Sequence, residues 1–398
     1  MGDWRRRLFV SYNEITSEAQ TFCYPLECDS ISDFYESKST DIGKTYILEP
    51  ELKQAWFPTR FLISNAYDST GSFNGLSEVE LLSFKQLSLV FGEIINMKIV
   101  QNVLLSIHKY SIVSNYISSQ TSANANGEDE IFIVSNELIG NERPLMQLFG
   151  SQNAESVVQW RNYVYGVDAN MGIVWRYSQD GLNAISDYKL KTFLRNELHD
   201  RTKILGVFDE FNQEYLISLI GNKPALTVSF SEPKNRWVSL YSFIPEYYGQ
   251  YGNKIVSFLN GRLWVHDENS LYNNFYGAQF QSELIFVVNK DNVLPKVWHT
   301  LFLELLSTAN KNNWDIYEIN NDNGQLSRLN KQSFIKKEAY YHAPYKRDLN
   351  TVGVSNPILN GRVLRSNMLV IKMRNDGTGL ETLKGIVNEY QISERITN

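Results

Sequence analysis

Two groups of residues in this sequence have types that could bind a nucleotide or a metal. Gly43-Lys44-Thr45 resembles the end of a phosphate-binding loop, but Lys38 stands where the first glycine should be and no buried strand precedes the run. The histidines are far apart, and none has a neighbour at metal-ligand or nucleophile-elbow spacing: His108, His199, His266, His299 and His342. We interpret the tripeptide as chance and the histidines as surface or interface residues.

Carboxylates supply two further candidates. The run His266-Asp267-Glu268-Asn269 could offer oxygens to calcium, but it lacks the alternation of an ion-binding loop and falls where a hairpin turn is expected, so we interpret it as a solvated turn. Glycoside hydrolysis needs two carboxylates about 5 to 9 Å apart. The available acids sit at turns or alone on strands: Asp209, Glu210, Glu214 and Glu283.

Aromatic residues at Tyr247, Tyr248 and Tyr251, with Gly249 and Gly252 between them, suit sugar stacking and a subunit interface equally. None of these patterns amounts to a site. The sequence therefore predicts no enzyme, no catalytic, cofactor-binding or metal-binding residue, and no cofactor.

Composition bounds the class of protein. The 398 residues are 43% apolar and 21% charged, which is typical of a folded chain of two domains, or of one propeller with an attached domain. Aromatic residues make up 13%, with 23 Tyr and 21 Phe, which favours β-structure and large interfaces. The net charge is −6 and the basic residues are dispersed, which disfavours a grip on duplex DNA but allows DNA to slide past.

Cellular context follows from the cysteines and the apolar runs. Cys23 and Cys28 cannot form a zinc site by themselves, and we expect free thiols in a reducing cytosol. The basic N-terminus is not followed by a signal-peptide core, and no apolar run approaches the roughly 18 residues that span a bilayer. We expect no secretion and no membrane insertion.

The strand pattern sharpens along the chain. Residues 1–90 read as irregular, 94–100 and 103–107 as a hairpin, 122–129 as an exposed loop and 131–134 as a buried strand. Beyond these, short β-branched and aromatic runs separated by turn residues predict antiparallel meanders. The runs are 157–160, 163–167 and 173–177; then 204–208, 215–219 and 226–230; then 255–258, 262–266 and 284–288; and 314–318, which opens a fourth unit.

The turn residues Asp168, Asp209, Asp267 and Asn321 recur at blade-like intervals, which favours a propeller, whereas a β-sandwich array is the alternative. Residues 187–195 have near-helical apolar spacing and predict a short connecting helix. The predicted fold is mainly β: an irregular region over 1–90, then a propeller-like domain over 91–398, with repeating meanders at about 150–330 and closing strands at about 357–398.

Several segments resemble the muzzle, or tail nozzle, proteins of crAss-like phages. They are 149–158, beginning Phe149-Gly150-Ser151-Gln152, then 163–168 with 172–176, then 181–189, and 360–366 with 368–372 as a closing strand. The resemblance extends over about 90–398. Muzzle proteins are usually longer, so this chain is expected to be a short variant, a cleaved piece or one gene of a split pair.

The resemblance implies a structural subunit made in the bacterial host cytoplasm and built into the phage tail. It implies a ring, with six copies, that contacts adjacent tail proteins and surrounds the route by which DNA leaves. The competing hypotheses are a receptor-binding or glycan-binding tail module and, ranked after it, a depolymerase. A binding module should hold a specific glycan, whereas a wall component should stay bound to the tail.

Overall fold

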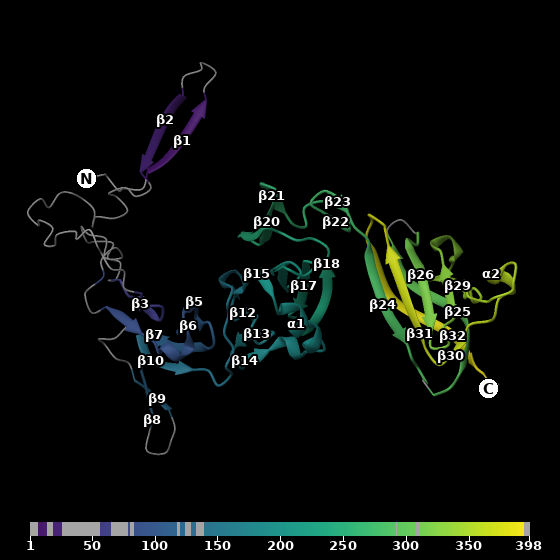
Figure 1. Cartoon of the computed structure of the whole chain (residues 1–398), viewed down its shortest axis with the longest axis horizontal. Helices are drawn as coiled ribbons and strands as arrows, with labels where there is room; N and C mark the ends of the chain where they lie inside the picture. Colours follow the sequence, from purple (N-terminus) through teal and green to yellow (C-terminus); the bar gives the residue numbers. More distant parts are fainter. Residues whose placement is uncertain are drawn as a thin grey trace, which may run out of the picture. The chain divides into compact units, whose positions relative to one another are not determined.

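A computed structural model shows a chain built of small antiparallel sheets (Figure 1). It describes residues 7–13, 19–25, 56–64, 79, 83–117, 120–123, 129–132, 139–291, 293–307 and 311–393. The chain divides into two compact units, one of residues 1–206 with 221–223 and one of residues 207–220 with 224–398. The mainly β prediction is confirmed. No helix among these residues is long and apolar enough to cross a membrane.

The N-terminal part of the first unit contains three antiparallel strand pairs. They are β1 (Arg7–Asn13) with β2 (Ala19–Pro25), β3 (Arg60–Leu62) with β4 (Phe84–Gln86), and β8 (Gln120–Ala123) with β9 (Asp129–Phe132). The predicted loop at 122–129 and strand at 131–134 are only partly covered, since 124–128 and 133–134 lie outside the described residues. The side chain of Cys23, together with Cys28 and residues 43–45, also lies outside them.

A four-stranded sheet follows in the order β10-β7-β6-β5. Its strands are β5 (Ile94–Val100), β6 (Val103–His108), β7 (Ile112–Ile117) and β10 (Ile139–Pro144). The predicted hairpin at 94–107 is confirmed as β5 and β6, and its turn places Gln101 at positive φ.

The first predicted meander is confirmed and gains a fourth strand. Its strands are β11 (Val158–Trp160), β12 (Tyr163–Asp168), β13 (Ile173–Ser178) and β14 (Gly181–Ala184), paired in sequence order. The predicted helix is α1 (Lys191–Leu198), shifted a few residues toward the C-terminus. Leu194 and Leu198 are its buried residues, and Leu194 belongs to the apolar spacing that predicted the helix.

The second predicted meander is also four-stranded, in the order β15-β16-β17-β18. The strands are β15 (Arg201–Asp209), β16 (Glu214–Gly221), β17 (Leu226–Ser231) and β18 (Arg236–Tyr241). Asp209 builds the predicted first turn, because its carboxylate accepts the backbone N–H groups of Phe211 and Asn212.

The third predicted meander is wrong in its last strand. β19 (Tyr247–Tyr251), β20 (Lys254–Leu259) and β21 (Arg262–Val265) form a three-stranded sheet. Residues 284–288 do not join it: they belong to β24 (Ser282–Val288), which pairs with β31 (Leu369–Asn375). A two-stranded pair, β22 (Asn274–Phe275) and β23 (Ala278–Gln279), lies between them in the chain. A short apolar run looks the same whichever partner it takes, so local turn signals could not reveal this distant pairing.

The C-terminal part of the second unit, residues 282–393, is a two-layer β-sandwich. One sheet has the order β24-β31-β26-β27; the other has the order β28-β29-β25-β30, and β32 pairs with β25. The remaining strands are β25 (Lys296–Ser307), β26 (Trp314–Asn321), β27 (Leu326–Leu329), β28 (Ile335–Lys337), β29 (Tyr340–Pro344), β30 (Arg365–Ser366) and β32 (Glu381–Ile392), with helix α2 at Pro357–Asn360.

One hydrophobic core joins these two sheets. Leu301 and Leu303 of β25 pack in the same cluster as Ile316 of β26 and Ile371 of β31, and all four are fully buried. The run 314–318 therefore opens no fourth meander: as β26 it lies beside β31 in the sandwich. The alternative prediction, a β-sandwich, thus describes residues 282–393. Whether the meanders before it close into a propeller stays a prediction.

Candidate functional site

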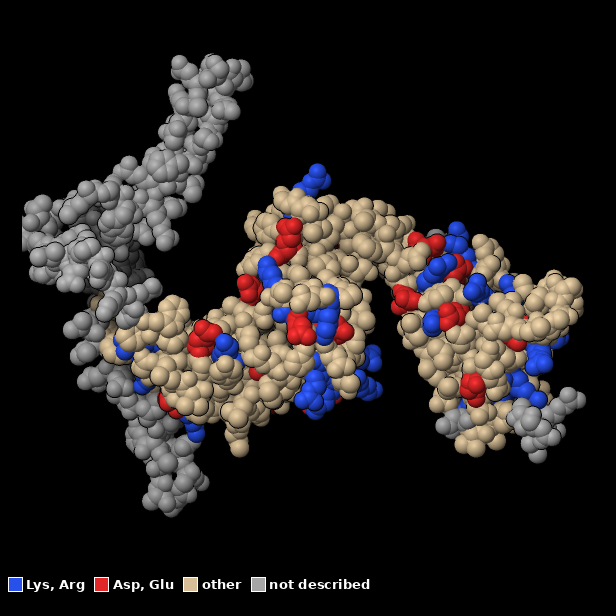
Figure 2. All heavy atoms as spheres, viewed as in Figure 1, with Lys and Arg blue, Asp and Glu red and all other residues tan. Residues whose placement is uncertain are grey.

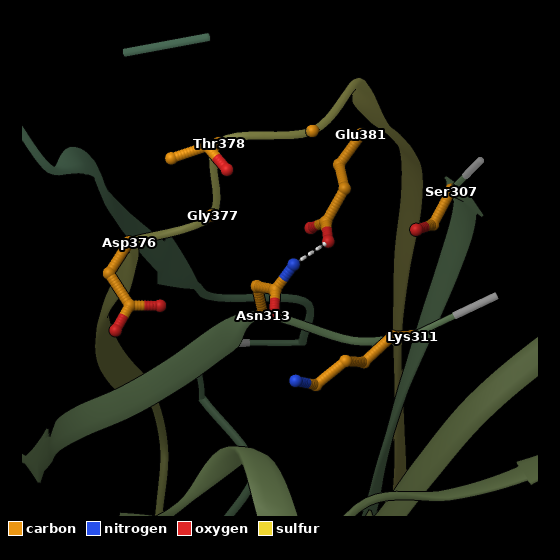
Figure 3. Close-up of a pocket in the computed structure, with 8 residues that line it drawn as sticks. Ser307, Lys311, Asn313, Asp376, Gly377, Thr378 and Glu381 are labelled. Atoms are coloured by element: carbon orange, nitrogen blue, oxygen red, sulfur yellow. Dashed lines mark hydrogen bonds between the residues drawn. The ribbon is translucent and has the colours of Figure 1, made fainter. Parts of the chain in front are cut away.

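A polar pocket lies at one end of the sandwich, where the loop between β31 and β32 meets the segment entering β26 (Figure 3). Its volume is about 420 Å³. The residues that line it are Ser307, Lys311, Asn313, Asp376, Gly377, Thr378, Gly379 and Glu381. Its polar lining could hold a small polar ligand.

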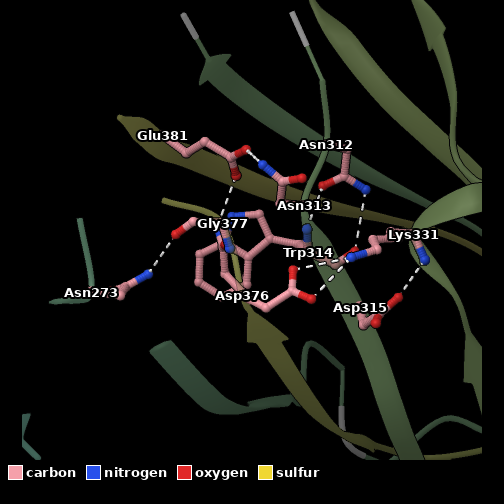
Figure 4. Close-up of polar contacts among 10 residues, drawn as sticks. Asn273, Asn312, Asn313, Trp314, Asp315, Lys331, Asp376, Gly377 and Glu381 are labelled. Atoms are coloured by element: carbon pink, nitrogen blue, oxygen red, sulfur yellow. Dashed lines mark hydrogen bonds and ion pairs between the residues drawn. The ribbon is translucent and has the colours of Figure 1, made fainter. Parts of the chain in front are cut away.

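The pocket walls are held by hydrogen bonds between asparagines and one carboxylate (Figure 4). Both Asn313 and Asn375 donate their side-chain amides to Glu381, the second over 2.8 Å. Asn375 also accepts the backbone N–H of Gly377 over 2.6 Å, which fixes the turn after β31. Asn273 donates to the Gly377 carbonyl over 3.1 Å and so ties the preceding segment to this turn.

A second carboxylate near the pocket is also engaged. Asp376 forms an ion pair with Lys331 over 3.0 Å, and Asp315 accepts the backbone N–H of Lys331. Both acidic groups that line the pocket therefore have donors already. The arrangement can offer hydrogen bonds to a neutral polar ligand, but it presents no nucleophile with an adjacent base.

The structure separates the five histidines, and the surface interpretation fails for His108. That side chain is buried, its Nδ1 lies 2.8 Å from the Gly92 carbonyl oxygen, and its ring meets the edge of Phe91. Burial lowers the pKa of His108. His199 and His299 are exposed. His342 stacks on Phe302 at 5.8 Å, so it too has a packing role.

His266 is half-buried, and its side chain forms a hydrogen bond with the side chain of a serine. Its Nε2 lies 2.7 Å from the Ser257 hydroxyl, which also bonds the Tyr276 hydroxyl over 2.9 Å. Ser257 has no exposed surface, and Phe243 packs edge-on against the imidazole at 5.0 Å. A substrate cannot reach this serine, so the pair is structural. Burial lowers the pKa of His266 and favours its neutral form.

The rest of the run is a turn, as predicted. Asp267 is exposed at positive φ, Glu268 pairs with Lys254, and Asn269 accepts the backbone N–H of Leu271. No group of three or more His, Cys, Asp or Glu side chains in the described part of the chain is placed to hold a metal ion.

The four candidate acids have separate roles. Asp209 caps its turn, and Glu210 is exposed beside it. Glu214 accepts the Tyr241 hydroxyl over 3.3 Å, and burial raises the pKa of Glu214. Glu283 accepts the Tyr317 hydroxyl on the outer face of the sandwich. Each acid is thus committed to a turn or a tyrosine, or points to solvent.

The three tyrosines lie on both faces of β19. Tyr248 is buried, and its hydroxyl bonds Ser218 over 2.8 Å, whereas Tyr247 and Tyr251 are exposed on the opposite face. Sequence reasoning grouped the three, although the strand period of two separates Tyr248 from the others.

The residues that carry the muzzle-like pattern form a buried hydrogen-bonded cluster. Asp168 accepts the backbone N–H of Gly150 over 2.9 Å and the side-chain amide of Gln152 over 3.1 Å. Trp175 donates its indole N–H to the Gly150 carbonyl over 2.8 Å, and Gly166 lies directly opposite it on β12. We call Gly150, Gln152, Gly166, Asp168 and Trp175 the signature cluster. Its role is architectural, because every polar group named here is engaged inside the fold.

The pocket was not predicted, because its residues come from segments far apart in sequence. Strands β26 to β30 lie between Asn313 and Asn375 in the chain, and both asparagines looked like ordinary turn residues. The available signal was the clustering of Asn, Asp and Gly at 311–313 and 375–379. Such clusters are more typical of turns than of binding sites.

Residues 270–348 match the family model of the Crassvirus muzzle protein C-terminal domain, and this confirms the resemblance to crAss-like phage muzzle proteins. The match implies a structural component of the muzzle in the phage tail. No curated protein matches the chain. The likeness at 149–189 and 360–372 lies outside the matched range and stays a prediction.

Proposed function

We propose that the chain is a wall subunit of the ring at the distal end of a crAss-like phage tail, where it surrounds the route of DNA exit without gripping DNA. The carrying observation is the match of residues 270–348 to the muzzle C-terminal domain. That range runs from the segment before β22 to Asp348, after β29, and so includes much of the sandwich.

Surface chemistry supports this proposal. The net charge is −6 and most basic residues are dispersed along the chain, which disfavours a grip on phosphates, so DNA could pass a wall of such subunits. The sandwich also leaves long strand edges: β24 and β32 each have only one partner strand among the described residues. Exposed edges favour pairing with another chain, and in a closed ring neighbouring subunits can cover them.

Imaging of the intact particle tests the proposal. Virions that carry an affinity tag at the C-terminus of this chain should show label at the distal tail, in six copies, by electron microscopy with subtomogram averaging. Label on the capsid, or a single copy per virion, would contradict the ring. Virions with an untagged chain control for nonspecific label.

A tail-associated receptor-binding or glycan-binding module is the second candidate, and the pocket beside Asn313 and Glu381 favours it. Such a module should bind a host-surface glycan on an array, and replacing Asn313 with Leu should abolish that binding. A depolymerase would in addition shorten the polysaccharide. We expect neither binding nor turnover for a wall subunit.

A further inference from the structure

Five buried side-chain atoms of the first unit have no hydrogen-bond partner among the described residues. They are the Oγ atoms of Ser106 and Ser111, Nε2 of His108, and both the nitrogen and the oxygen of the Asn115 amide. Ser111 is 2% exposed, and the other three residues have no exposed surface. We call these four residues the polar strip.

The strand register places the polar strip on one face of the sheet β10-β7-β6-β5. Ser106 and His108 are two residues apart on β6, so their side chains point to the same side. The backbone N–H of His108 bonds the Ser111 carbonyl, and Leu104 pairs with Asn115. Ser111 therefore lies across from His108. Asn115, opposite Leu104, is the diagonal neighbour of Ser106.

That face of the sheet lies inside the unit. Leu104, on the same face of β6, belongs to one buried cluster with Phe61 of β3, Leu87 and Ile139. Leu105, on the opposite face, belongs to a separate buried cluster. Both faces of β6 are thus covered. In Figure 2 the charged side chains in view lie scattered over the surface, whereas the polar strip is interior.

The protonation of His108 is fixed by its other ring nitrogen. Nδ1 lies 2.8 Å from the Gly92 carbonyl oxygen, which can only accept, so Nδ1 carries the hydrogen. Burial lowers the pKa of His108 and favours the neutral ring. Nε2 is therefore an acceptor. A partner for the whole strip must donate to Nε2 and also accept from the Asn115 amide, as a water molecule can.

Spacing in the sheet also fits water. Side chains that face each other across two antiparallel strands have Cβ atoms about 5 Å apart, and diagonal neighbours are about 7 Å apart. Such separations are too long for a direct hydrogen bond between short side chains, but one water molecule spans them. Buried waters typically make about three hydrogen bonds to groups of this kind.

The energetic argument points the same way. A buried polar atom without a partner loses its hydration and gains nothing in return. Five such atoms in one place would cost an amount comparable to the whole stability of a domain. A folded chain that keeps these residues in its interior therefore has to supply them with partners.

We propose that the polar strip binds ordered internal water molecules, which bridge His108 to Ser111 and Ser106 to Asn115. The backbone carbonyl of His108 also accepts the N–H of Ser151 over 2.9 Å. Ser151 directly follows Gly150 of the signature cluster, so the bound water stabilises the end of β6 against which that cluster packs. This inference concerns the interior of the first unit and does not depend on the tail location.

The sign of a stability change tests the proposal in the full chain. If the Ser106 hydroxyl bonds a water molecule, Ser106→Ala removes that bond and lowers the midpoint of urea unfolding. If the hydroxyl has no partner, Ser106→Ala removes a buried unpaired group, and the midpoint stays or rises. Asn115→Leu, which keeps the approximate shape, separates the two cases in the same way.

Ser114→Ala is the matched control. Ser114 is also a buried serine of β7, but it lies on the other face and donates to the Arg143 carbonyl over 3.0 Å. We expect Ser106→Ala to lower the midpoint about as much as Ser114→Ala does, and Asn115→Leu to lower it more. The double variant should fall by less than the sum of the two, because the first substitution already frees the shared water.

A crystal structure of the full chain that resolves ordered water gives the direct measurement. Water should lie within hydrogen-bond distance of His108 Nε2 and of the Asn115 amide, and the second of these waters should be missing from Asn115→Leu. Unchanged or raised midpoints for Ser106→Ala and Asn115→Leu would overturn the proposal. So would density showing a larger molecule, or direct bonds between the four side chains. None of these results bears on the tagged virions, which test the tail location separately.

Discussion

Replacing Gly166 with Ala tests whether the signature cluster is architectural. An added Cβ at this position would lie 2.2 Å from Cζ2 of Trp175, whose side chain is fully buried. The indole must then move, and it also donates to the Gly150 carbonyl over 2.8 Å.

The expected cost combines two effects. Overpacking of a filled core costs about 1 to 3 kcal/mol, and loss of one buried hydrogen bond costs about 1 kcal/mol. We therefore expect Gly166→Ala to lower the free energy of unfolding by about 2 to 4 kcal/mol. The same substitution is then made in the Trp175→Leu variant, which lacks the indole ring and whose own free energy of unfolding is lower by about 3 kcal/mol. In that background Gly166→Ala should cost nearly nothing, because the space is free.

Urea unfolding of the four proteins, followed by circular dichroism, measures this coupling as a double-mutant cycle. Gly385→Ala is the control, since a Cβ there would make ordinary contacts, 3.4 Å from a flexible Glu304 oxygen. An equal cost of Gly166→Ala in both backgrounds would refute the packing argument, because the clash with Trp175 would then contribute nothing.

Three further predictions follow from buried polar groups. Asp168→Ala leaves the Gly150 N–H without its acceptor and should lower the free energy of unfolding by about 3 kcal/mol, against less than about 0.5 for exposed Asp180→Ala, in urea titrations. Lys296 is buried, and its ammonium group donates to three carbonyl oxygens, so Lys296→Met should lower the free energy of unfolding by about 3 kcal/mol. A smaller loss, measured by thermal melting, would show that the carbonyl groups find other donors. Burial lowers the pKa of His266 in the folded chain, so only the unfolded chain gains this proton just below pH 6.5, and stability should fall with acidification from pH 7.5 to 5.5 by at most about 1.4 kcal/mol per pH unit. His266→Gln should reduce that slope, while buried His108, whose pKa is lowered in the same way, keeps its own contribution, and an unchanged slope would contradict the assignment.

Local parts of the fold were predictable from the sequence. The hairpin at 94–107 and the strands of the first two meanders lie where turn residues and apolar runs placed them. Asp168 and Asp209 were recognised as turn residues, and both carboxylates accept backbone N–H groups in the turns they start. Such signals act within a few residues, so sequence alone carries them.

Long-range pairing was not predictable in the same way. The apolar run in β24 pairs with β31, although most strands of the sandwich lie between the two in the sequence. Nothing in the run distinguishes β31 from β21 as its partner. The burial of His108 was not predictable for the same reason. Its neighbours Gly92 and Phe91 come from the segment before β5, and the residue type of His108 gives no information about them.

Residue type and residue exposure carry different information in this chain. The polar groups that looked chemically active, such as His266 with Ser257 and Asp209, are occupied inside turns and aromatic packing. The side chains left without cover are aliphatic and aromatic, at Leu263 and Leu359. Because uncovered apolar surface is costly in water, a lone subunit in solution would be better served by polar residues at both positions. Apolar side chains there are typical of a surface that contacts another protein, rather than of a site for chemistry.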